Sequence, residues 1–440
     1  MKKPLLIKTQ IIVLAAIAIC LAIILMSHCN KEEAISEQTY LQLLKEAHAA
    51  VIKYYVDPPD PKKLMKGMVD GVLASLDPHS AYLPPEPYKE MEEQISGAFG
   101  GIGIELGMKE DRLTVIAPIE DTPAFRAGIQ PNDHIFKINA TFTRGMNISK
   151  AVSRMRGEKG TPVTLTVLRE KVDHPLTFKL IRDVIKIKSL KTRILEPGYG
   201  LIRISQFQEH TGSDFKKALK ELRAAAGGTF KGLVIDLRFN PGGLLVSAVE
   251  VANCFIGHDP ANSLIVSTKG RLPDSNQMIR ATVGEKEPRY PIVVLINAGS
   301  ASASEIVAGA LQDHKRAVIM GQQSFGKGSV QSIFPLPGNA ALKLTTARYY
   351  TPSGRSIQAK GITPDVLVAG YKPIEKTAGQ AENIREQDLE RSLAPDGKKD
   401  AVRLPHSGLV DPDSKKDYQL TRALELLRSL DLVREQRLVR

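Results

Sequence analysis

The chain has 440 residues, of which 42% are hydrophobic and 25% charged, a globular profile that excludes a disordered chain and allows two or three domains. Its 60 Lys and Arg residues outnumber 48 Asp and Glu, for a formal net charge of +12. Because the basic residues are scattered and form no nucleic-acid-binding signature, we expect a basic, solubilising surface and no nucleic-acid partner. The three cysteines, Cys20, Cys29 and Cys254, indicate neither a disulfide framework nor a metal site, and Cys254 is typical of a small buried core residue.

Residues 1–30 read as an export signal or membrane anchor. Lysines at positions 2, 3 and 8 precede sixteen apolar residues at 11–26, between the lengths of a signal-peptide core and a spanning helix. The basic flank predicts that the N-terminus stays in the cytoplasm and the rest reaches the periplasmic or other extracytoplasmic side. No small-x-small cleavage site follows, and His28 before Cys29 is a poor fit to a lipoprotein. We favour a retained or inefficiently cleaved anchor over lipidation, and over a buried core helix.

Residues 36–95 predict a helical region. Leu, Ala and Val recur on one helical face from 41 to 52, and a similar pattern follows the break at 58–61. The stretch 76–83 then turns the chain. We expect His79 to be a turn residue rather than a catalytic base, because nothing near it in sequence offers a nucleophile.

Residues 97–183 change to short strands, predicted at 102–106, 113–116, 135–138 and 163–168, with a short helix at 147–155. The motifs Gly-Gly-Ile-Gly-Ile-Glu-Leu at 100–106, Asp-Thr-Pro-Ala-Phe-Arg-Ala-Gly at 121–128 and Pro-Asn-Asp-His-Ile-Phe-Lys-Ile-Asn at 131–139 resemble a PDZ domain of the bacterial protease type. The simpler alternative is a small β-domain whose glycines only serve turns.

The PDZ resemblance implies a binding site for protein or peptide substrates with apolar C-termini. In the usual mode, loop N–H groups hold the terminal carboxylate and the peptide pairs as an added strand. The carboxylate loop would be Gly101, Ile102 and Gly103. The apolar pocket would be lined by Ile104, Val152 and Met155.

Residues 184–370 alternate buried strands with helices. Near-continuous apolar runs at 232–238 and 291–297 are typical of parallel strands, helices are predicted at 245–252 and from 302 to about 312, and a strand at 317–320. This alternation predicts an α/β domain with a central β-sheet covered by helices. The fold class is therefore a multi-domain α/β chain: an N-terminal helical region, a β-domain and this larger domain.

Two patches of the α/β domain suit nucleophilic chemistry. Ser302 follows a strand and begins a helix, where open α/β sheets place their sites, although helix capping by Ser300, Ser302 and Ser304 explains the same serines. Lys327 is flanked by glycines without a neighbouring carboxylate, so burial would lower its pKa from about 10.4 and let it accept a proton. Gln331, four residues on, could orient the amine. A phosphate-binding loop is disfavoured because its full spacing is missing.

A third patch, Asp-Leu-Arg-Phe-Asn-Pro-Gly-Gly at 236–243, directly follows a strand. Acyl transfer needs N–H donors aimed at the developing oxyanion. Gly242 or Gly243, together with the N–H of Ala303, would supply two donors. A tight turn is the simpler interpretation.

Together these patches, with Ala-Arg-Tyr-Tyr-Thr-Pro-Ser-Gly at 347–354, resemble the carboxy-terminal processing proteases over residues 36–370. The resemblance implies a serine endopeptidase that cuts near substrate C-termini, with Ser302 as nucleophile, Lys327 as base and Gln331 beside them. It implies no metal and no cofactor. A homodimer or an activating adaptor is possible, and the PDZ domain could gate activity.

Three alternatives stay open at this point. The chain could be a catalytically inactive PDZ adaptor, an α/β enzyme acting on thioesters, or a Ser–His enzyme using His210 or His314. The charged tail at 371–440 ends in an amphipathic stretch, which is either a docking or dimer helix or a loosely held segment.

Overall fold

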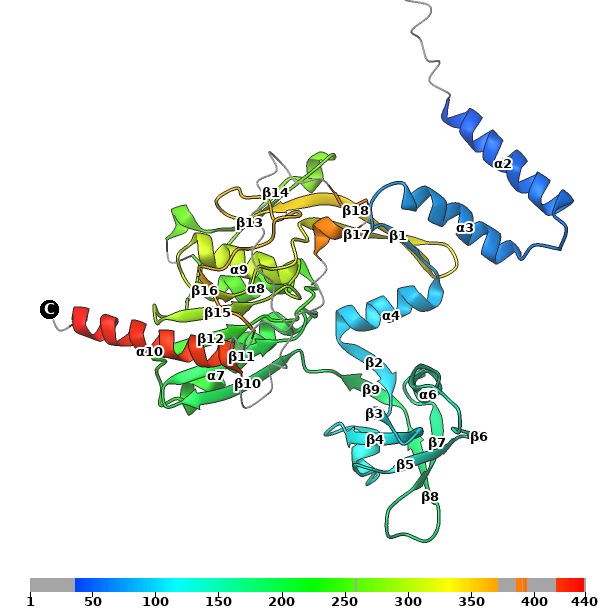
Figure 1. Ribbon diagram of the computed structural model, residues 1–440, viewed down its shortest axis with the longest axis horizontal. Coiled ribbons are helices and arrows are strands. Elements are labelled where there is room, and N and C mark those ends of the chain that lie inside the picture. The colour runs from blue at the N-terminus through cyan, green and yellow to red at the C-terminus, as the bar shows by residue number, and fades with distance from the viewer. Residues whose placement is uncertain (1–35, 258, 371–384, 390, 394–416, 439–440) are drawn as a thin grey trace, which may run out of the picture. The chain divides into compact units, whose positions relative to one another are not determined.

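A computed structural model describes residues 36–257, 259–370, 385–389, 391–393 and 417–438 (Figure 1). The predicted anchor at 1–30, with Cys20 and Cys29, lies outside the described residues. Within the described part of the chain, no helix combines the length and apolarity needed to cross a bilayer. The chain divides into two compact units, Met1–Gly71 and Val72–Arg440.

The first unit confirms the predicted helices. Helix α2 spans Glu37–Tyr54 and begins at Ser36, whose Oγ accepts the N–H of Thr39 at 3.3 Å. Helix α3 (Pro61–Ala74) starts at a proline, as the first helical turn permits, and its last residues enter the second unit. No residue of α2 is buried.

A small β-domain follows helix α4 (Pro85–Ser96). Its sheet has the order β3-β4-β5-β7-β8 with β6 paired to β5, so β3 is an edge strand, while β2 pairs separately with β9 where the chain enters and leaves the domain (Figure 1). The core holds Ile102, Ile135, Leu165 and Met155 among others. The elements are β2 (Ala98–Gly101), β3 (Ile104–Lys109), β4 (Arg112–Pro118), α5 (Pro123–Arg126), β5 (His134–Ile138), β6 (Thr141–Phe142), α6 (Ile148–Met155), β7 (Pro162–Leu168), β8 (Leu176–Ile181) and β9 (Asp183–Lys186).

The predicted strands of this domain are confirmed, with one correction. The strand predicted from 102 begins at Ile104, because Gly103 adopts φ 77° and the carbonyl of Ile102 turns to accept the N–H of Ala124 at 2.9 Å. A side chain at 103 would also meet Thr122 at 2.3 Å. The residues before β3 therefore form a loop rather than a strand.

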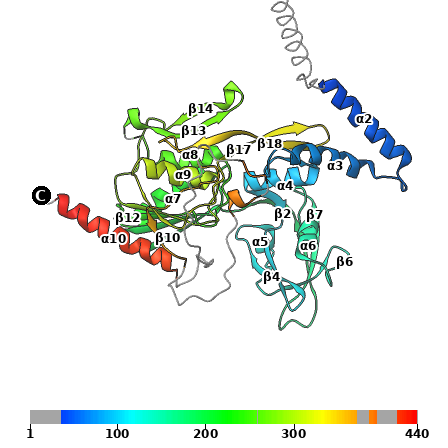
Figure 2. The ribbon, with the colours of Figure 1, turned by 45° about the horizontal axis from the view of Figure 1, so that its top comes forward.

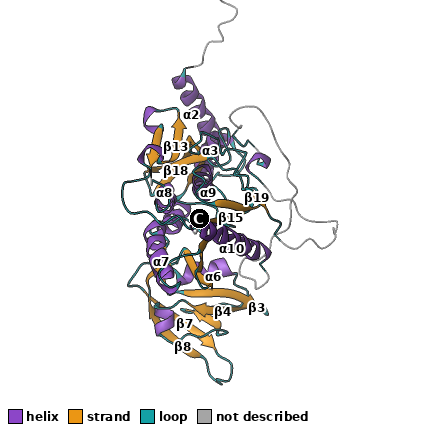
Figure 3. Cartoon of the chain, turned by 90° about the vertical axis from the view of Figure 1, so that its left-hand side faces the viewer, coloured by secondary structure: helices purple, strands orange, loops and turns teal. Residues whose placement is uncertain are grey.

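The larger domain is built on a six-stranded sheet of order β10-β11-β12-β15-β16-β19, parallel except for the β10–β11 pair. Alternate residues of its strands face opposite layers: Leu233 and Ile235 pack against α7, α8 and α9, whereas Val234 packs against α10 (Figure 3). The elements are β10 (Leu190–Glu196), β11 (Tyr199–Ile204), α7 (Thr211–Ala225), β12 (Gly232–Asp236), α8 (Leu245–Asn253), β15 (Ile292–Ile296), α9 (Ala303–Asp313), β16 (Val318–Gly321), β19 (Val366–Leu367) and α10 (Tyr418–Leu438). The predicted α/β alternation is confirmed.

A second sheet, which sequence patterns missed, covers the outer side of α8 and α9 (Figure 2). It contains a long hairpin and short strands: β1 (Ala81–Leu83), β13 (Leu264–Gly270), β14 (Gln277–Arg280), β17 (Ser329–Leu336) and β18 (Ala340–Tyr350). Strand β1 pairs with β18. Part of the region predicted to be helical therefore pairs with a strand more than 250 positions away. Short 3-10 helices lie at Pro260–Asn262, Pro273–Ser275 and Glu386–Asp388.

The end of the tail forms helix α10, which packs on its own chain rather than being loosely held. Leu420, Ala423 and Leu427 are buried against the parallel sheet. At its start, the carboxylate of Asp417 accepts two hydrogen bonds from Arg238 at 2.9 and 2.6 Å, and Asp236 takes the other side of the same guanidinium at 2.9 and 2.7 Å. Burial lowers the pKa of Arg238, but the two carboxylates outweigh burial and raise it above its usual value.

Candidate active site

Ser302 lies where strand β15 gives way to helix α9, as the N-cap residue of that helix. Its backbone has φ 54° and ψ −113°, a region that non-glycine residues rarely occupy. The flanking serines explain how the turn is held, since the buried hydroxyl of Ser300 donates to Leu237 O at 2.8 Å and that of Ser304 to Asn240 O at 2.9 Å. These two serines fasten the turn to the 236–243 loop and leave the half-buried Ser302 between them.

Glu305 joins the two patches that carry Ser302 and Lys327. One oxygen, Oε2, accepts the N–H of Ser302 at 2.7 Å and the N–H of Lys327 at 2.9 Å. The other, Oε1, accepts the hydroxyl of Ser324 at 2.5 Å and the N–H of Gly326 at 2.8 Å. The backbones of the candidate nucleophile and base therefore meet at a single carboxylate oxygen.

The charge state of Glu305 follows from this geometry. Burial raises its pKa to about 7, against the hydrogen bonds that lower it. All four partners donate to Glu305. The Ser324 hydroxyl, which donates to Glu305, also accepts the N–H of Ile362 at 2.6 Å. The contacts therefore favour the carboxylate, burial favours the neutral acid, and the balance leaves the pKa of Glu305 at about 7, above its usual value. From the sequence alone, an acidic residue in the first turn of a helix indicates only a favourable interaction with the helix N-terminus.

Lys327 occupies a loop that glycines bring close to the rest of the domain. A side chain at Gly326 would meet the backbone of residues 359–361 at 3.1–3.2 Å, and one at Gly328 would meet the backbone N of Gln358 at 2.3 Å. Burial is the largest influence on the half-buried Lys327 and lowers its pKa, and the positive charge of Lys343 lowers it further. The lysine therefore gives up its proton more readily than an exposed one.

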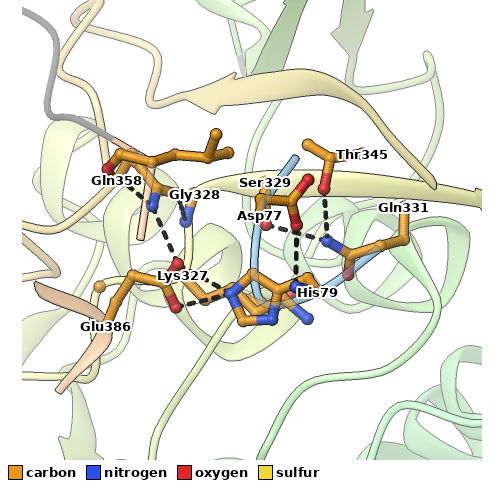
Figure 4. A network of polar contacts seen from close by, with 12 residues as sticks. Asp77, His79, Lys327, Gly328, Ser329, Gln331, Thr345, Gln358 and Glu386 are labelled. Atoms are coloured by element: carbon orange, nitrogen blue, oxygen red, sulfur yellow. Dashed lines mark hydrogen bonds and ion pairs between the residues drawn. The ribbon is translucent and has the colours of Figure 1, made fainter. Parts of the chain in front are cut away.

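The backbone N–H groups of Ser302 and Lys327 both donate to Glu305, but among the described residues no hydrogen bond joins Ser302 Oγ to Lys327 Nζ. Such bonds often tighten only when substrate is bound. Gln331 is not directed at the amine either. Its amide donates to Ser329 Oγ at 3.0 Å and to Thr345 Oγ1 at 3.4 Å (Figure 4), because β17 begins at Ser329 and a register shift at 330–331 breaks the expected alternation.

The glycine pair lies against the serine. A side chain at Gly242 would meet Ser302 Cβ at 2.8 Å and Ala303 N at 3.0 Å, so only glycine fits there. The N–H of Gly242 already donates to Asn240 Oδ1 at 2.9 Å. Within the described part of the chain, the N–H groups of Gly243 and Ala303 have no acceptor. Of the alternatives Gly242 and Gly243, the geometry leaves Gly243 as the available donor, next to Ala303.

Neither alternative histidine reaches the serine. His314 ends helix α9, at the opposite end from Ser302, and its ring nitrogen donates to Leu264 O at 2.6 Å. His210 is exposed, and no hydrogen bond of its ring occurs among the described residues. The Ser–His interpretation has no support in the geometry.

His79 does lie in a turn, as predicted, but the turn is part of a buried polar network (Figure 4). Its ring Nε2 lies 2.7 and 2.8 Å from the two oxygens of Glu386, and its backbone N–H donates to Asp77 Oδ1 at 2.8 Å. Glu386 also accepts from Gln358 at 3.0 Å. No local pattern could have indicated this network, because His79 and Glu386 are 307 residues apart.

The predicted peptide site of the β-domain is partly core. Ile102 and Met155 are buried in the domain core, whereas Ile104 and Val152 are half-buried. The N–H groups of Ile102 and Gly103 have no acceptor among the described residues, and the adjoining strand β3 is a sheet edge. Free N–H groups beside an open edge are the elements that strand addition uses.

Comparison with known proteins identifies the family of the chain. The profile of Peptidase family S41 matches residues 198–368 and that of the PDZ domain matches residues 100–180. The chain is 46% identical over 396 residues to the carboxy-terminal-processing protease of Bartonella bacilliformis, covering 89% of each chain. It is 35% identical over 329 residues to the carboxy-terminal processing protease CtpB of Bacillus subtilis, covering 74% of this chain and 67% of that one.

Among solved structures, the photosystem II D1 C-terminal processing protease aligns with 27% identity and a TM-score of 0.43, covering 76% of this chain and 89% of that chain. Because these sequence matches extend over most of the chain, the family is a peptidase family, and neither an adaptor family nor a thioester-enzyme family. The chain belongs to the carboxy-terminal-processing proteases, PDZ-containing serine-type peptidases of family S41.

Proposed function

We propose that this peptidase works through a Ser–Lys dyad and selects substrates by their C-terminal tail. The observation that carries the dyad is the shared Glu305 oxygen, which holds the N–H groups of Ser302 and Lys327 at 2.7 and 2.9 Å. The lowered pKa of Lys327, caused chiefly by burial, supports its role as a base.

In the proposed reaction, neutral Lys327 takes the proton from Ser302 Oγ as that oxygen attacks the scissile carbonyl carbon. The N–H groups of Gly243 and Ala303 donate to the oxyanion that forms. Collapse of the intermediate breaks the C–N bond, and the lysine returns the proton to the leaving amine. The same lysine then activates water, which hydrolyses the acyl-enzyme and regenerates Ser302.

The β-domain is proposed to bind the substrate's terminal carboxylate at the N–H groups of Ile102 and Gly103. The rest of the tail would pair along the open edge of β3, with apolar side chains toward Ile104 and Val152. Strand addition supplies affinity through main-chain hydrogen bonds, so tails of different sequence can be held as long as they end in a free carboxylate.

The test is digestion of a peptide with an apolar C-terminus by the wild type and by Ser302→Ala and Lys327→Ala. Each variant should lose about 10³-fold or more in kcat, because each removes one member of an interdependent pair. An amidated copy of the peptide should be cut with a higher KM. Undiminished cleavage by either variant would exclude the dyad, and equal cleavage of the amidated peptide would exclude carboxylate recognition.

A further inference from the structure

A short segment from the tail packs against the loop that carries Lys327. We call residues 385–389 the strap. The N–H of Glu386 donates to Phe325 O at 3.3 Å, and Arg385 Nη1 donates to Gln323 Oε1 at 3.3 Å. Both acceptors lie in the stretch between β16 and Lys327. The strap follows the family's matched region, which ends at residue 368.

The side chain of Glu386 enters the domain and organises a polar chain that ends next to the lysine. It is fully buried and is held by His79 Nε2 at 2.7 and 2.8 Å and by Gln358 Nε2 at 3.0 Å (Figure 4). Gln358, also fully buried, accepts the N–H of Gly328 at 3.0 Å through its Oε1. Because Gly328 directly follows Lys327, the chain of contacts runs from the strap to the backbone of the proposed base.

Charged groups surround Lys327 from several elements. Burial and the positive charge of Lys343, on β18, lower its pKa. Three carboxylates raise it: Glu386 on the strap, Glu305 on α9 and Asp77 in the turn that also holds His79. Glu386 is therefore both a mechanical support of the lysine loop and a charge that opposes the effect of burial.

Resting on the assignment of Lys327 as general base, we propose that Glu386 is a positioning residue of the active site. The buried network His79–Glu386–Gln358 holds the lysine loop through the N–H of Gly328. A buried carboxylate without partners is costly, so the presence of a histidine and an amide on its oxygens indicates a site built to keep it there.

The experiment compares full-length Glu386→Ala and Glu386→Gln with Gln387→Ala, an exposed neighbour on the same strap. Glu386→Ala frees Gln358 and His79, so kcat should fall about tenfold through loss of alignment, with KM unchanged. Glu386→Gln keeps the shape and one acceptor oxygen but removes the charge, so kcat at the optimal pH should stay close to that of the wild type. Gln387→Ala should match the wild type.

The pH profile separates positioning from simple structural support. Removing the charge in Glu386→Gln lowers the pKa of Lys327, so the acid limb of kcat/KM should move to lower pH. An acid limb that stays in place or moves to higher pH overturns the proposal, as does an unchanged kcat in folded Glu386→Ala. If Glu386→Ala fails to fold, Glu386→Gln decides. Full activity of Lys327→Ala would refute the assignment of Lys327 as general base. An inactive Lys327→Ala together with Glu386 variants that match the wild type in kcat and pH profile would refute only the positioning role of Glu386.

Discussion

Glu305 shows how one buried side chain can set the geometry of two others. Its oxygens accept hydrogen bonds from Ser302 N, Lys327 N, Gly326 N and the Ser324 hydroxyl. The turn at Ser302 and the loop that carries Lys327 therefore depend on the same group. Replacing one oxygen by an NH₂ group would place a donor against donors. A buried donor left without an acceptor costs about 1–3 kcal/mol.

We therefore expect Glu305→Gln to lower kcat by about tenfold or more, and Ser324→Ala, which removes one donor only, to lower it less.

The stability of the protein should also depend on pH through Glu305. Burial raises the folded pKa of Glu305 to about 7, above its unfolded value, so ionising this buried side chain costs free energy in the folded state. The stability of the protein should therefore fall as pH rises from the unfolded pKa to about 7. Urea unfolding at pH 5 and 8 should show the stability of the wild type falling relative to Glu305→Gln. A constant difference, or an unchanged kcat, would contradict this role.

At the scale of elements, helix α10 closes the second face of the parallel sheet. Its apolar side chains pack on Val234, Val293 and Leu295, and its first turn is fixed by the Arg238–Asp417 ion pair. The Asp-Leu-Arg motif at 236–238 therefore has a structural role: it links the 236–243 loop to the start of helix α10.

Leu427→Ala should reduce the free energy of unfolding by about 2–5 kcal/mol, because Leu427 is fully buried and its removal leaves a cavity. Leu432→Ala on the same helix is the matched control, since Leu432 is 60% exposed. Urea unfolding of both variants measures the difference. A loss of similar size in the control, or none in Leu427→Ala, would mean that the helix is not docked in solution.

At the scale of the whole molecule, the β-domain has a core of its own and closes on itself through the β2–β9 pair. A fragment spanning 97–187 should therefore unfold cooperatively and bind a peptide with a free apolar C-terminus. Calorimetry with the free and the amidated peptide measures carboxylate recognition apart from cleavage. Fragment Val152→Asp should bind more weakly, because a charge replaces a half-buried apolar side chain of α6. Equal binding of both peptides would exclude a carboxylate-specific site.

How far the sequence predicts this molecule depends on the range of each interaction. The helices and parallel strands followed from periodicity, and Ser302, Lys327 and the glycine pair followed from motifs near strand ends. The second sheet was missed because β1 pairs with residues 341–343, and Glu386 because its partner is His79. Gln331 was expected to face Lys327, but a bulge directs its amide to Ser329. Long-range pairing and local irregularity account for these differences.

The positive φ of Ser302 lowers the stability of the folded protein. A glycine at this position would adopt the same backbone without strain, so the folded state is less favourable with serine there than the fold alone requires. The turn that lowers stability is also the one that presents the Ser302 hydroxyl beside Gly242, where no side chain fits.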